Sequence, residues 1–214
     1  MHFGLICNEY PPAAHGGIGS SNFDLAEGLA AAGHEVTVIG VYAAQHRFED
    51  LRESVNRPKI VRLKTSPTWL GYRSQVWFDR WRLHCWLARE HACHRFDLIE
   101  FSDYGGWLPW GGPKGVPVVC RLQGTNAFFD RELSRVGDEF EHELERRSLQ
   151  RADSWIGLSQ FVFSKTLSLC HLEQHPGAII HHAVDAELFS PGKADEAEPG
   201  LVVFVNSLNP KKGI

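Results

Sequence analysis

A glycine-rich stretch behind the first apolar run of the chain decides the fold. Its sequence is Asn8-Glu9-Tyr10-Pro11-Pro12-Ala13-Ala14-His15-Gly16-Gly17-Ile18-Gly19-Ser20-Ser21-Asn22. A strand-like run precedes it, and a helical pattern extends from about Gly19 to Ala32, where Gly33 favours a left-handed cap. Strand, glycine-rich loop, helix and second strand in this order predict a β-α-β unit.

Short runs of β-type residues recur along the chain, separated mostly by longer segments with helical patterning. They are Phe3–Cys7, Glu35–Val41, Lys59–Leu63, Asp97–Phe101, Pro117–Arg121, Ser154–Leu158 and Ala178–His181. This alternation predicts a mainly parallel sheet with helices on both faces, which is a doubly wound α/β domain. Ligands of such sheets bind at the carboxyl ends of the strands.

Two more long helices are expected, at Gln75–His94 and Asp138–Arg151. Four residues of the first recur at helical spacing, namely Trp77, Trp81, Cys85 and Ala88. Aromatic residues at this spacing predict core packing rather than a ligand site. In the second helix acidic residues precede basic ones, an order that complements the helix dipole and indicates a solvated charged face.

Composition and charge exclude several classes of protein. The chain has 214 residues, 43% of them hydrophobic, which predicts one buried domain with an appendage. Its 22 basic and 26 acidic residues give a net charge of -4, which argues against a nucleic-acid binder. Five cysteines without a CxxC pair predict a reducing, cytoplasmic location, and we expect neither an export leader nor a membrane span.

The composition changes near the end of the chain. Residues 190–200 contain almost no apolar side chains and predict a flexible linker. A buried-type strand, Leu201–Val205, follows within the last part of the sequence. We therefore expect a domain at residues 1–189, a linker at 190–200 and the beginning of a second domain at 201–214.

The loop around Gly16, Gly17 and Gly19 is the first candidate site. Glycines permit positive φ and close backbone approach, while the free N–H groups of a helix start favour an anion or a sugar hydroxyl. The alternative is a tight turn without a ligand. Gly17-x-Gly19-x-x-Asn22 lacks the third glycine of the dinucleotide motif, and no P-loop sequence occurs.

Two other patterns are weaker. Gly157-Leu158-Ser159 superficially resembles a nucleophile elbow, but Phe161 stands where a second glycine is needed, so Ser159 is expected to cap the next helix. His and Cys residues cluster at positions 84–94 without the spacing of a zinc site, and we expect no metal.

Five segments, in order, resemble the retaining glycosyltransferases of family 4. They are the glycine-rich loop, Leu122-Gln123-Gly124-Thr125, the segment from Asp153 to Ser159, His182-Ala183-Val184-Asp185 with Phe189 and Pro191, and Phe204-Val205-Asn206-Ser207-Leu208-Asn209-Pro210-Lys211-Lys212-Gly213. The resemblance implies the N-terminal half of a GT-B fold, built of two Rossmann-like domains. It also implies transfer of a sugar from a nucleotide-sugar donor to an acceptor with retention, and without a cofactor or an essential metal.

The resemblance assigns roles to individual residues. Gly16 and Gly17 would contact the donor diphosphate and the acceptor, and Gln123, expected to be catalytic, stands where many members have a histidine near the reaction centre. Lys212 matches the lysine that neutralises the leaving diphosphate, whereas Ser207 replaces an expected arginine. Four further residues complete the expected site, with a catalytic role for Asp103 and binding roles for the others: Asp103, Gly124, Thr125 and Ser159.

Other functions stay open at this stage. A GT-B-type nucleotide-sugar epimerase would need acid-base groups facing the sugar. A noncatalytic sugar-binding or partner-binding domain is the third reading, favoured by Ser207 and Gln123. The expected partners are a nucleotide sugar and a carbohydrate or lipid-linked acceptor, with peripheral membrane contact as in some relatives. Without its second domain this chain is expected to be inactive.

Overall fold

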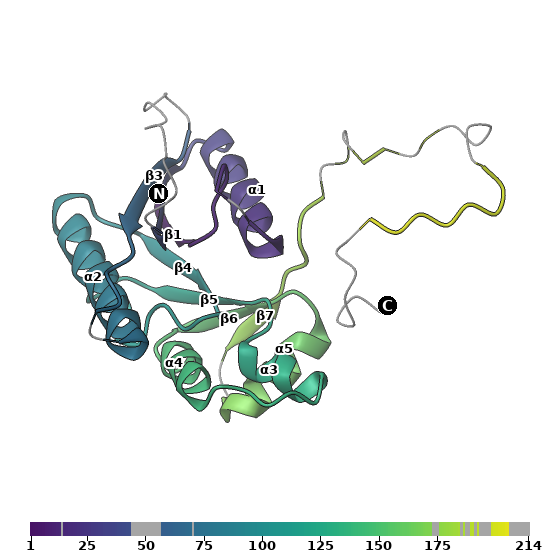
Figure 1. Cartoon of the computed structure of the whole chain (residues 1–214). Coiled ribbons are helices and arrows are strands. Elements are labelled where there is room, and N and C mark those ends of the chain that lie inside the picture. The colour runs from purple at the N-terminus through teal and green to yellow at the C-terminus, as the bar shows by residue number, and fades with distance from the viewer. Residues whose placement is uncertain are drawn as a thin grey trace. The chain divides into compact units, whose positions relative to one another are not determined.

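A computed structural model describes residues 1–13, 15–43, 57–69, 71–172, 176–184, 186, 189, 190, 192 and 198–205. Its strands are β1 (His2–Ile6), β2 (Glu35–Tyr42), β3 (Lys59–Lys64), β4 (Leu98–Ser102), β5 (Val118–Leu122), β6 (Ser154–Gly157) and β7 (Gly177–Ile179). They form one sheet in the order β3-β2-β1-β4-β5-β6-β7, and every neighbouring pair is parallel (Figure 1).

Five helices connect the strands within the described residues. They are α1 (Gly17–Ala31), α2 (Tyr72–Cys93), α3 (Asn126–Glu132), α4 (Glu139–Leu149) and α5 (Gln160–Cys170). The three long helices expected from the sequence are present with shifted ends, and Gly33 has the predicted positive φ of 84°. The short helix α3 was not expected.

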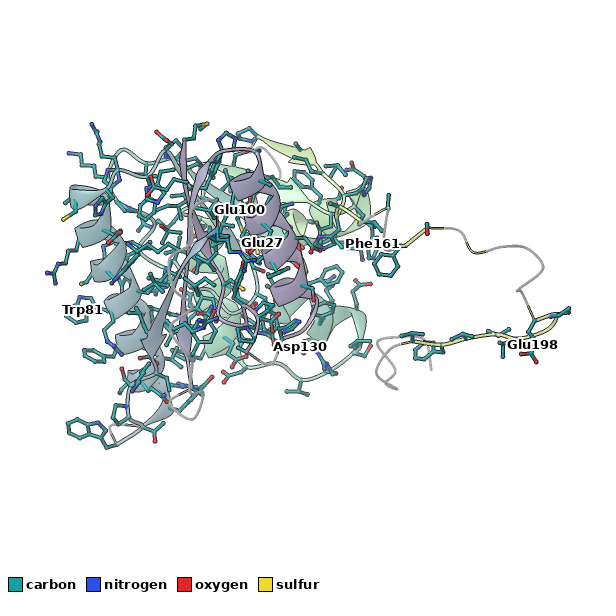
Figure 2. All side chains as sticks on the ribbon, turned by 90° about the horizontal axis from the view of Figure 1, so that it is seen from above. Glu27, Trp81, Glu100, Asp130, Phe161 and Glu198 are labelled. Carbon is teal, nitrogen blue, oxygen red and sulfur yellow. The ribbon has the colours of Figure 1, made fainter. Side chains whose placement is uncertain are left out.

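Side chains alternate along the strands and divide the core between the two faces of the sheet. Leu5 and Val38 pack with Ala26 and Ala30 of α1 on one face. On the opposite face, the other side chains of the strands pack against apolar residues of the other helices. These helix residues are Leu83, Leu87, Leu149 and Leu167. Figure 2 shows the strands between α1 and α2. The prediction of a doubly wound parallel sheet is confirmed.

The outer surface of α2 differs from the expectation. Trp77 is half-buried, but Trp81 is 49% exposed and Cys85 and Ala88 are exposed too. The helix buries a neighbouring stripe instead, which carries Leu83 and Leu87. The prediction of core packing was therefore wrong for Trp81, Cys85 and Ala88, because two apolar stripes run along this helix and only one faces the sheet.

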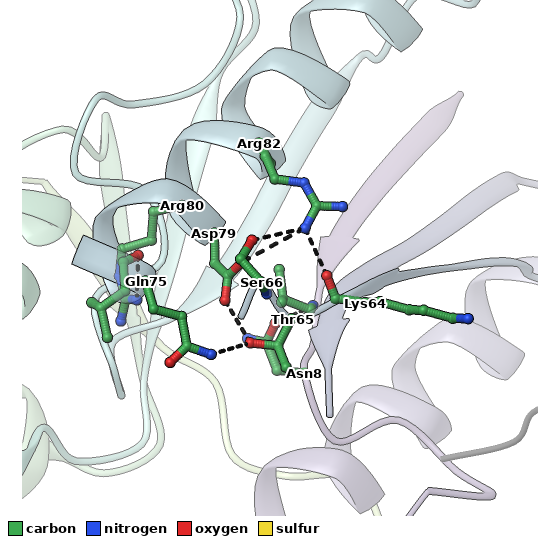
Figure 3. A network of polar contacts seen from close by, with 10 residues as sticks. Asn8, Lys64, Thr65, Ser66, Gln75, Asp79, Arg80 and Arg82 are labelled. Carbon is green, nitrogen blue, oxygen red and sulfur yellow. Dashed lines mark hydrogen bonds and ion pairs between the residues drawn. The ribbon is translucent and has the colours of Figure 1, made fainter. Parts of the chain in front are cut away.

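Asp79 of α2 is buried, and its carboxylate forms hydrogen bonds with the segment after β3 (Figure 3). Its carboxylate accepts hydrogen bonds from the Thr65 hydroxyl at 2.6 Å, from the Ser66 backbone N–H at 2.9 Å and from the Ser66 hydroxyl at 2.5 Å. Arg82 lies 3.6 Å from the same carboxylate and donates to the Lys64 carbonyl at 2.7 Å. This network is satisfied internally and fixes α2 to the sheet.

The chain divides into two units, residues 1–182 and 183–214. The first unit contains all the helices and strands named above. In the second, residues 201–205 are between 48% and 91% exposed and belong to no strand among the described residues, unlike the strand expected there. The domain boundaries at 189 and 200 stay a prediction. No helix in the described part of the chain is long and apolar enough to cross a membrane.

Candidate functional site

A small cavity lies beyond the carboxyl ends of β1 and β4. We call it the β1–β4 cavity. It measures about 160 Å³ and is lined by Ile6, Cys7, Asn8, Glu9, Ile18, Ser102, Tyr104 and Trp107. The chain winds in opposite directions from these two neighbouring strands, because β2 lies on one side and β5 on the other. Such a switch point is where parallel sheets bind their ligands.

The glycine-rich loop forms one side of this cavity, with a geometry that differs from the expectation. None of Gly16, Gly17 and Gly19 has a positive φ. Only Gly19 is tightly enclosed, because an added Cβ would lie 2.2 Å from the Glu9 carbonyl oxygen. A Cβ on Gly17 would meet nothing within 4 Å. Close backbone approach therefore explains Gly19, and positive φ explains none of the three.

Glu9 is the residue of this loop that the sequence reasoning missed. Its Oε1 accepts the Gly19 N–H at 2.7 Å, so a carboxylate of the chain itself lies where an anionic ligand was expected. A carboxylate at a helix N-terminus is favoured by the exposed N–H groups and the helix dipole. An acidic residue between the end of a strand and the start of the next helix was the available signal.

A second loop follows β5 and contains Gln123, Gly124 and Thr125. Asp103 organises it, since Oδ1 accepts the Gln123 N–H at 2.9 Å and Oδ2 accepts the Gly124 N–H at 3.0 Å. Gly124 has a φ of 111°, a conformation that favours glycine. The Thr125 hydroxyl accepts the Phe128 N–H at 2.9 Å and caps α3.

Asp103 is placed to position this loop rather than to touch a ligand. Its side chain has no exposed surface, although Ser102 and Tyr104 on either side line the β1–β4 cavity. Burial raises the pKa of the Asp103 carboxyl to about 7, and the N–H donors of Gln123 and Gly124 oppose that rise. The catalytic role expected for Asp103 stays a prediction, and the contacts of its carboxylate are those of a positioning residue.

Glu145 of α4 is a second buried carboxylate that the sequence did not reveal. Its Oε1 accepts N–H groups from Gly105 and from the backbone and side chain of Asn126, at 2.9, 2.9 and 3.0 Å. Burial raises its pKa above the usual range. Arg80 donates to the carbonyls of Gly105 and Gly106 from the other side. The loops after β4 and β5 are thus joined through buried charges.

Gln123 has an unused donor. Its Nε2 is buried and has no hydrogen-bond partner among the described residues. An amide donor without a partner is destabilising, so such a group is a candidate for contact with a ligand or water. Gln123 lies one residue beyond the carboxyl end of β5, and its expected catalytic role stays a prediction.

The other predicted residues are distributed as follows. Ser159 accepts the Val162 N–H at 3.2 Å and caps α5, as its pattern indicated. None of the predicted site residues that are described lines the β1–β4 cavity, and these are Gly16, Gly17, Asp103, Gln123, Gly124, Thr125 and Ser159. Lys212 and Ser207 lie outside the described residues. Among the residues that are described, no three His, Cys, Asp or Glu side chains are grouped to hold a metal ion.

His182 closes the first unit against α1. Its Nδ1 lies 2.8 Å from the Ser21 hydroxyl. Burial, followed by the charge of Arg121, lowers the pKa of His182. The neutral ring is therefore favoured, and it can form a hydrogen bond with the Ser21 hydroxyl.

Comparison with known proteins shows which proteins the chain is similar to. An uncharacterised glycosyltransferase of Methanocaldococcus jannaschii is 21% identical over 235 residues, which cover 100% of this chain and 57% of that protein. Sucrose-phosphate synthase from Thermosynechococcus elongatus has a TM-score of 0.69 at 20% identity, covering 89% of this chain and 50% of the other. A structure described as trehalose-6-phosphate from E. coli bound with UDP-2-fluoro glucose has a TM-score of 0.52 at 13% identity, covering 88% and 50%.

These similarities agree with the fold described above, and the chain spans little more than half the length of these proteins. The structural neighbours confirm the predicted Rossmann-like half of a GT-B fold. The model of Glycosyltransferase Family 4 matches residues 15–188, which contain both loops of the candidate site. The chain therefore belongs to Glycosyltransferase Family 4 and carries the N-terminal domain of such an enzyme.

Proposed function

We propose that this chain is the acceptor-side domain of an enzyme that transfers a sugar, with retention, from a nucleotide-sugar donor to a carbohydrate or lipid-linked acceptor. The β1–β4 cavity is the observation that carries the proposal, because it lies at the switch point of the sheet and is lined by the glycine-rich loop of the family. The similar E. coli structure bound with UDP-2-fluoro glucose supports a nucleotide-sugar donor.

The residues around the cavity suit hydroxyl recognition. Tyr104 and Trp107 provide aromatic surface for a sugar ring, and Glu9 provides acceptor oxygen. We assign the unpaired Gln123 amide to a hydroxyl of the transferred sugar. Gln123 can hold that sugar in place but cannot carry a charge, so its contribution is positioning and hydrogen bonding. Positioning can lower a reaction barrier by roughly 7 to 11 kcal/mol.

Donor binding is assigned mainly to the part of the enzyme beyond this chain. Lys212 would neutralise the leaving diphosphate, with Gly16 and Gly17 approaching it from the N-terminal domain. The 214-residue chain therefore binds nucleotide sugar weakly and transfers nothing measurable by itself. The carboxylates of Asp103 and Glu145 accept backbone N–H groups, so neither is free for the acid-base chemistry that the alternative, an epimerase, would need.

A donor-consumption assay tests this function. The longest natural chain that contains these residues is incubated with UDP-, GDP- and ADP-sugars and a panel of glycosides, and products are identified by mass spectrometry. We expect transfer with retained anomeric configuration, and about a 100-fold loss of kcat in Gln123→Ala. Gln150→Ala, an exposed glutamine at the end of α4, is the matched control.

Two results would contradict the proposal. Ordinary enzymatic turnover by the 214-residue monomer would refute the half-enzyme assignment. Failure of the complete chain to consume any nucleotide sugar, with its fold intact by circular dichroism, would refute the transferase assignment itself.

We also propose peripheral contact with the cytoplasmic face of a membrane, through the outer surface of α2 and the segment before it. Four large aromatic residues there are between 49% and 79% exposed: Trp69, Tyr72, Phe78 and Trp81. The two acidic residues of α2, Asp79 and Glu90, are both held in ion pairs, and Arg89 of the same helix is exposed. Aromatic and basic groups on one helix are typical of interfacial binding.

The exposed aromatic residues make this contact testable with vesicles. We expect the chain to co-sediment with vesicles containing phosphatidylglycerol and much less with pure phosphatidylcholine. Phe78→Ser with Trp81→Ser should abolish that difference, whereas Val136→Ser, an equally simple change of an exposed apolar residue, should retain it. If the double variant sedimented with phosphatidylglycerol vesicles as much as the wild type does, membrane contact through α2 would be refuted.

A further inference from the structure

The lining of the β1–β4 cavity carries a single charged side chain, and that charge is negative. Its eight lining residues include Glu9 but no lysine, arginine or histidine. A cavity that recognises a phosphoryl or carboxylate group normally places a cation or several free N–H groups within reach of it. No cation is present among the lining residues.

The Gly19 N–H at the start of α1 is not available to an anionic acceptor. The Gly19 N–H is already occupied by Glu9 Oε1 at 2.7 Å. A phosphate placed there would have to displace this carboxylate or lie beside it. Two like charges at about 4 Å repel by roughly 1 to 4 kcal/mol at effective dielectric constants of about 80 to 20, which corresponds to about five-fold or more in affinity.

The remaining lining groups suit an uncharged sugar. Burial and nearby glutamates raise the pKa of the Tyr104 phenol, so it stays protonated and can donate a hydrogen bond. Glu9 Oε2 has no hydrogen-bond partner among the described residues and can accept one. Trp107 contributes an aromatic wall, with Arg80 stacked 4.4 Å from its ring centroid. Donor, acceptor and apolar surface together match a pyranose ring.

We propose that the acceptor is an uncharged glycoside and that Glu9 excludes phosphorylated and other anionic sugars from the β1–β4 cavity. This specificity rests on the proposed function, because it concerns the acceptor of the same reaction. The volume of about 160 Å³ equals the space of about five water molecules, so the cavity takes one sugar ring and not a chain. Glu9 is thus a specificity-determining residue.

Ligand binding by the 214-residue chain tests the proposal without requiring a donor. The ¹⁵N-labelled protein is titrated with the methyl glycosides of glucose, mannose and galactose and with the 6-phosphates of the same sugars. The Gly19 amide and the Trp107 indole report on the cavity. We expect at least one methyl glycoside to shift both signals, and its 6-phosphate to bind at least about five-fold more weakly.

The variant Glu9→Gln separates charge from shape, because glutamine retains an oxygen that can accept the Gly19 N–H. We expect it to bring the neutral and phosphorylated sugars to within about two-fold of each other. Glu139→Gln, an exposed glutamate on α4, is the control and should retain the wild-type preference.

Three outcomes would overturn this specificity. They are tighter binding of a 6-phosphate by the wild type, an unchanged preference in Glu9→Gln, and the absence of a response to every methyl glycoside. None of them bears on nucleotide-sugar consumption by the complete chain, so the proposed function would be judged separately by that assay.

Discussion

Two loops of the sheet edge differ in how a carboxylate binds their backbone N–H groups. They are the loop between β1 and α1 and the loop between β5 and α3. Each follows a buried strand, and at each a carboxylate accepts backbone N–H groups. Glu9 belongs to its own loop, whereas Asp103 comes from the end of β4. Glu9 holds Gly19 with one oxygen and remains half-buried at the wall of a cavity. Asp103 holds Gln123 and Gly124 with both oxygens and has no exposed surface.

The difference shows how to separate a ligand-facing carboxylate from a structural one at the same edge of a sheet. A carboxylate whose two oxygens both accept backbone N–H groups has little hydrogen-bonding capacity for a substrate. One that retains an oxygen at a cavity can still select what enters it. The β5–α3 loop is therefore a preformed support, and the β1–α1 loop is where specificity is expected.

Removal of the buried support should have the largest effect. Glu145→Ala leaves the N–H groups of Gly105 and Asn126 without their acceptor and should lower the free energy of unfolding by about 3–5 kcal/mol. Glu139→Ala changes an exposed residue of the same helix and should cost less than about 1 kcal/mol. Urea denaturation of both variants measures the difference, and similar losses would contradict the structural role of Glu145.

The second effect is a pH dependence caused by Asp103. Burial raises its folded-state pKa from 3.8 to about 7, so the folded protein binds more protons than the unfolded chain between these values. Stability from this group is therefore greatest at low pH and falls as the pH rises toward 7, by up to about 1.4 kcal/mol per pH unit.

Asp103→Asn should remove that slope, which is best seen as the difference between wild type and variant in urea midpoints from pH 4 to pH 8. The difference cancels the titration of groups that both proteins share. Glu145→Gln should flatten the profile further, because burial raises that pKa as well. A difference that grows in favour of the wild type as the pH rises would contradict the raised pKa of Asp103.

Gly17 and Gly19, two glycines at the start of α1, should respond differently to the same change. Gly19→Ala places a methyl group 2.2 Å from the Glu9 carbonyl oxygen, so the loop must shift, at a cost of about 1–3 kcal/mol. Gly17→Ala meets nothing within 4 Å and should leave the melting temperature within about 2 °C. Calorimetry of the pair checks this, and equal destabilisation would show that the enclosure of Gly19 is not what matters.

The sequence predicted the strands closely, because β-type runs between helical segments are a local signal. It also predicted the caps at Gly33 and Ser159, which depend on residues next to each helix end. The helix α3 was missed because seven residues give too little periodicity to recognise.

The carboxylates of the candidate site could not be read from the sequence in the same way. Glu145 stands in a run of charges that is otherwise typical of a solvated face, and only the folded chain places it beneath Gly105 and Asn126. Asp103 and Gln123 are brought together by the pairing of β4 with β5. Contacts between distant segments decide these roles, whereas the glycine-rich loop is contiguous and was recognised as a candidate site.

The smallest expected effect on stability belongs to Glu9, whose role we assign to specificity. Glu9→Ala removes the acceptor of the Gly19 N–H at the start of α1, and the loss of such a cap costs about 1 kcal/mol, because water can reach part of this half-buried position. Glu9→Gln keeps an acceptor oxygen and should change the free energy of unfolding by less than about 0.5 kcal/mol. Chemical denaturation with both variants, beside the sugar titrations, tests this division. If Glu9→Gln were as damaging as Glu145→Ala, Glu9 would be a structural carboxylate like Asp103, and the contrast between the two loops would fail.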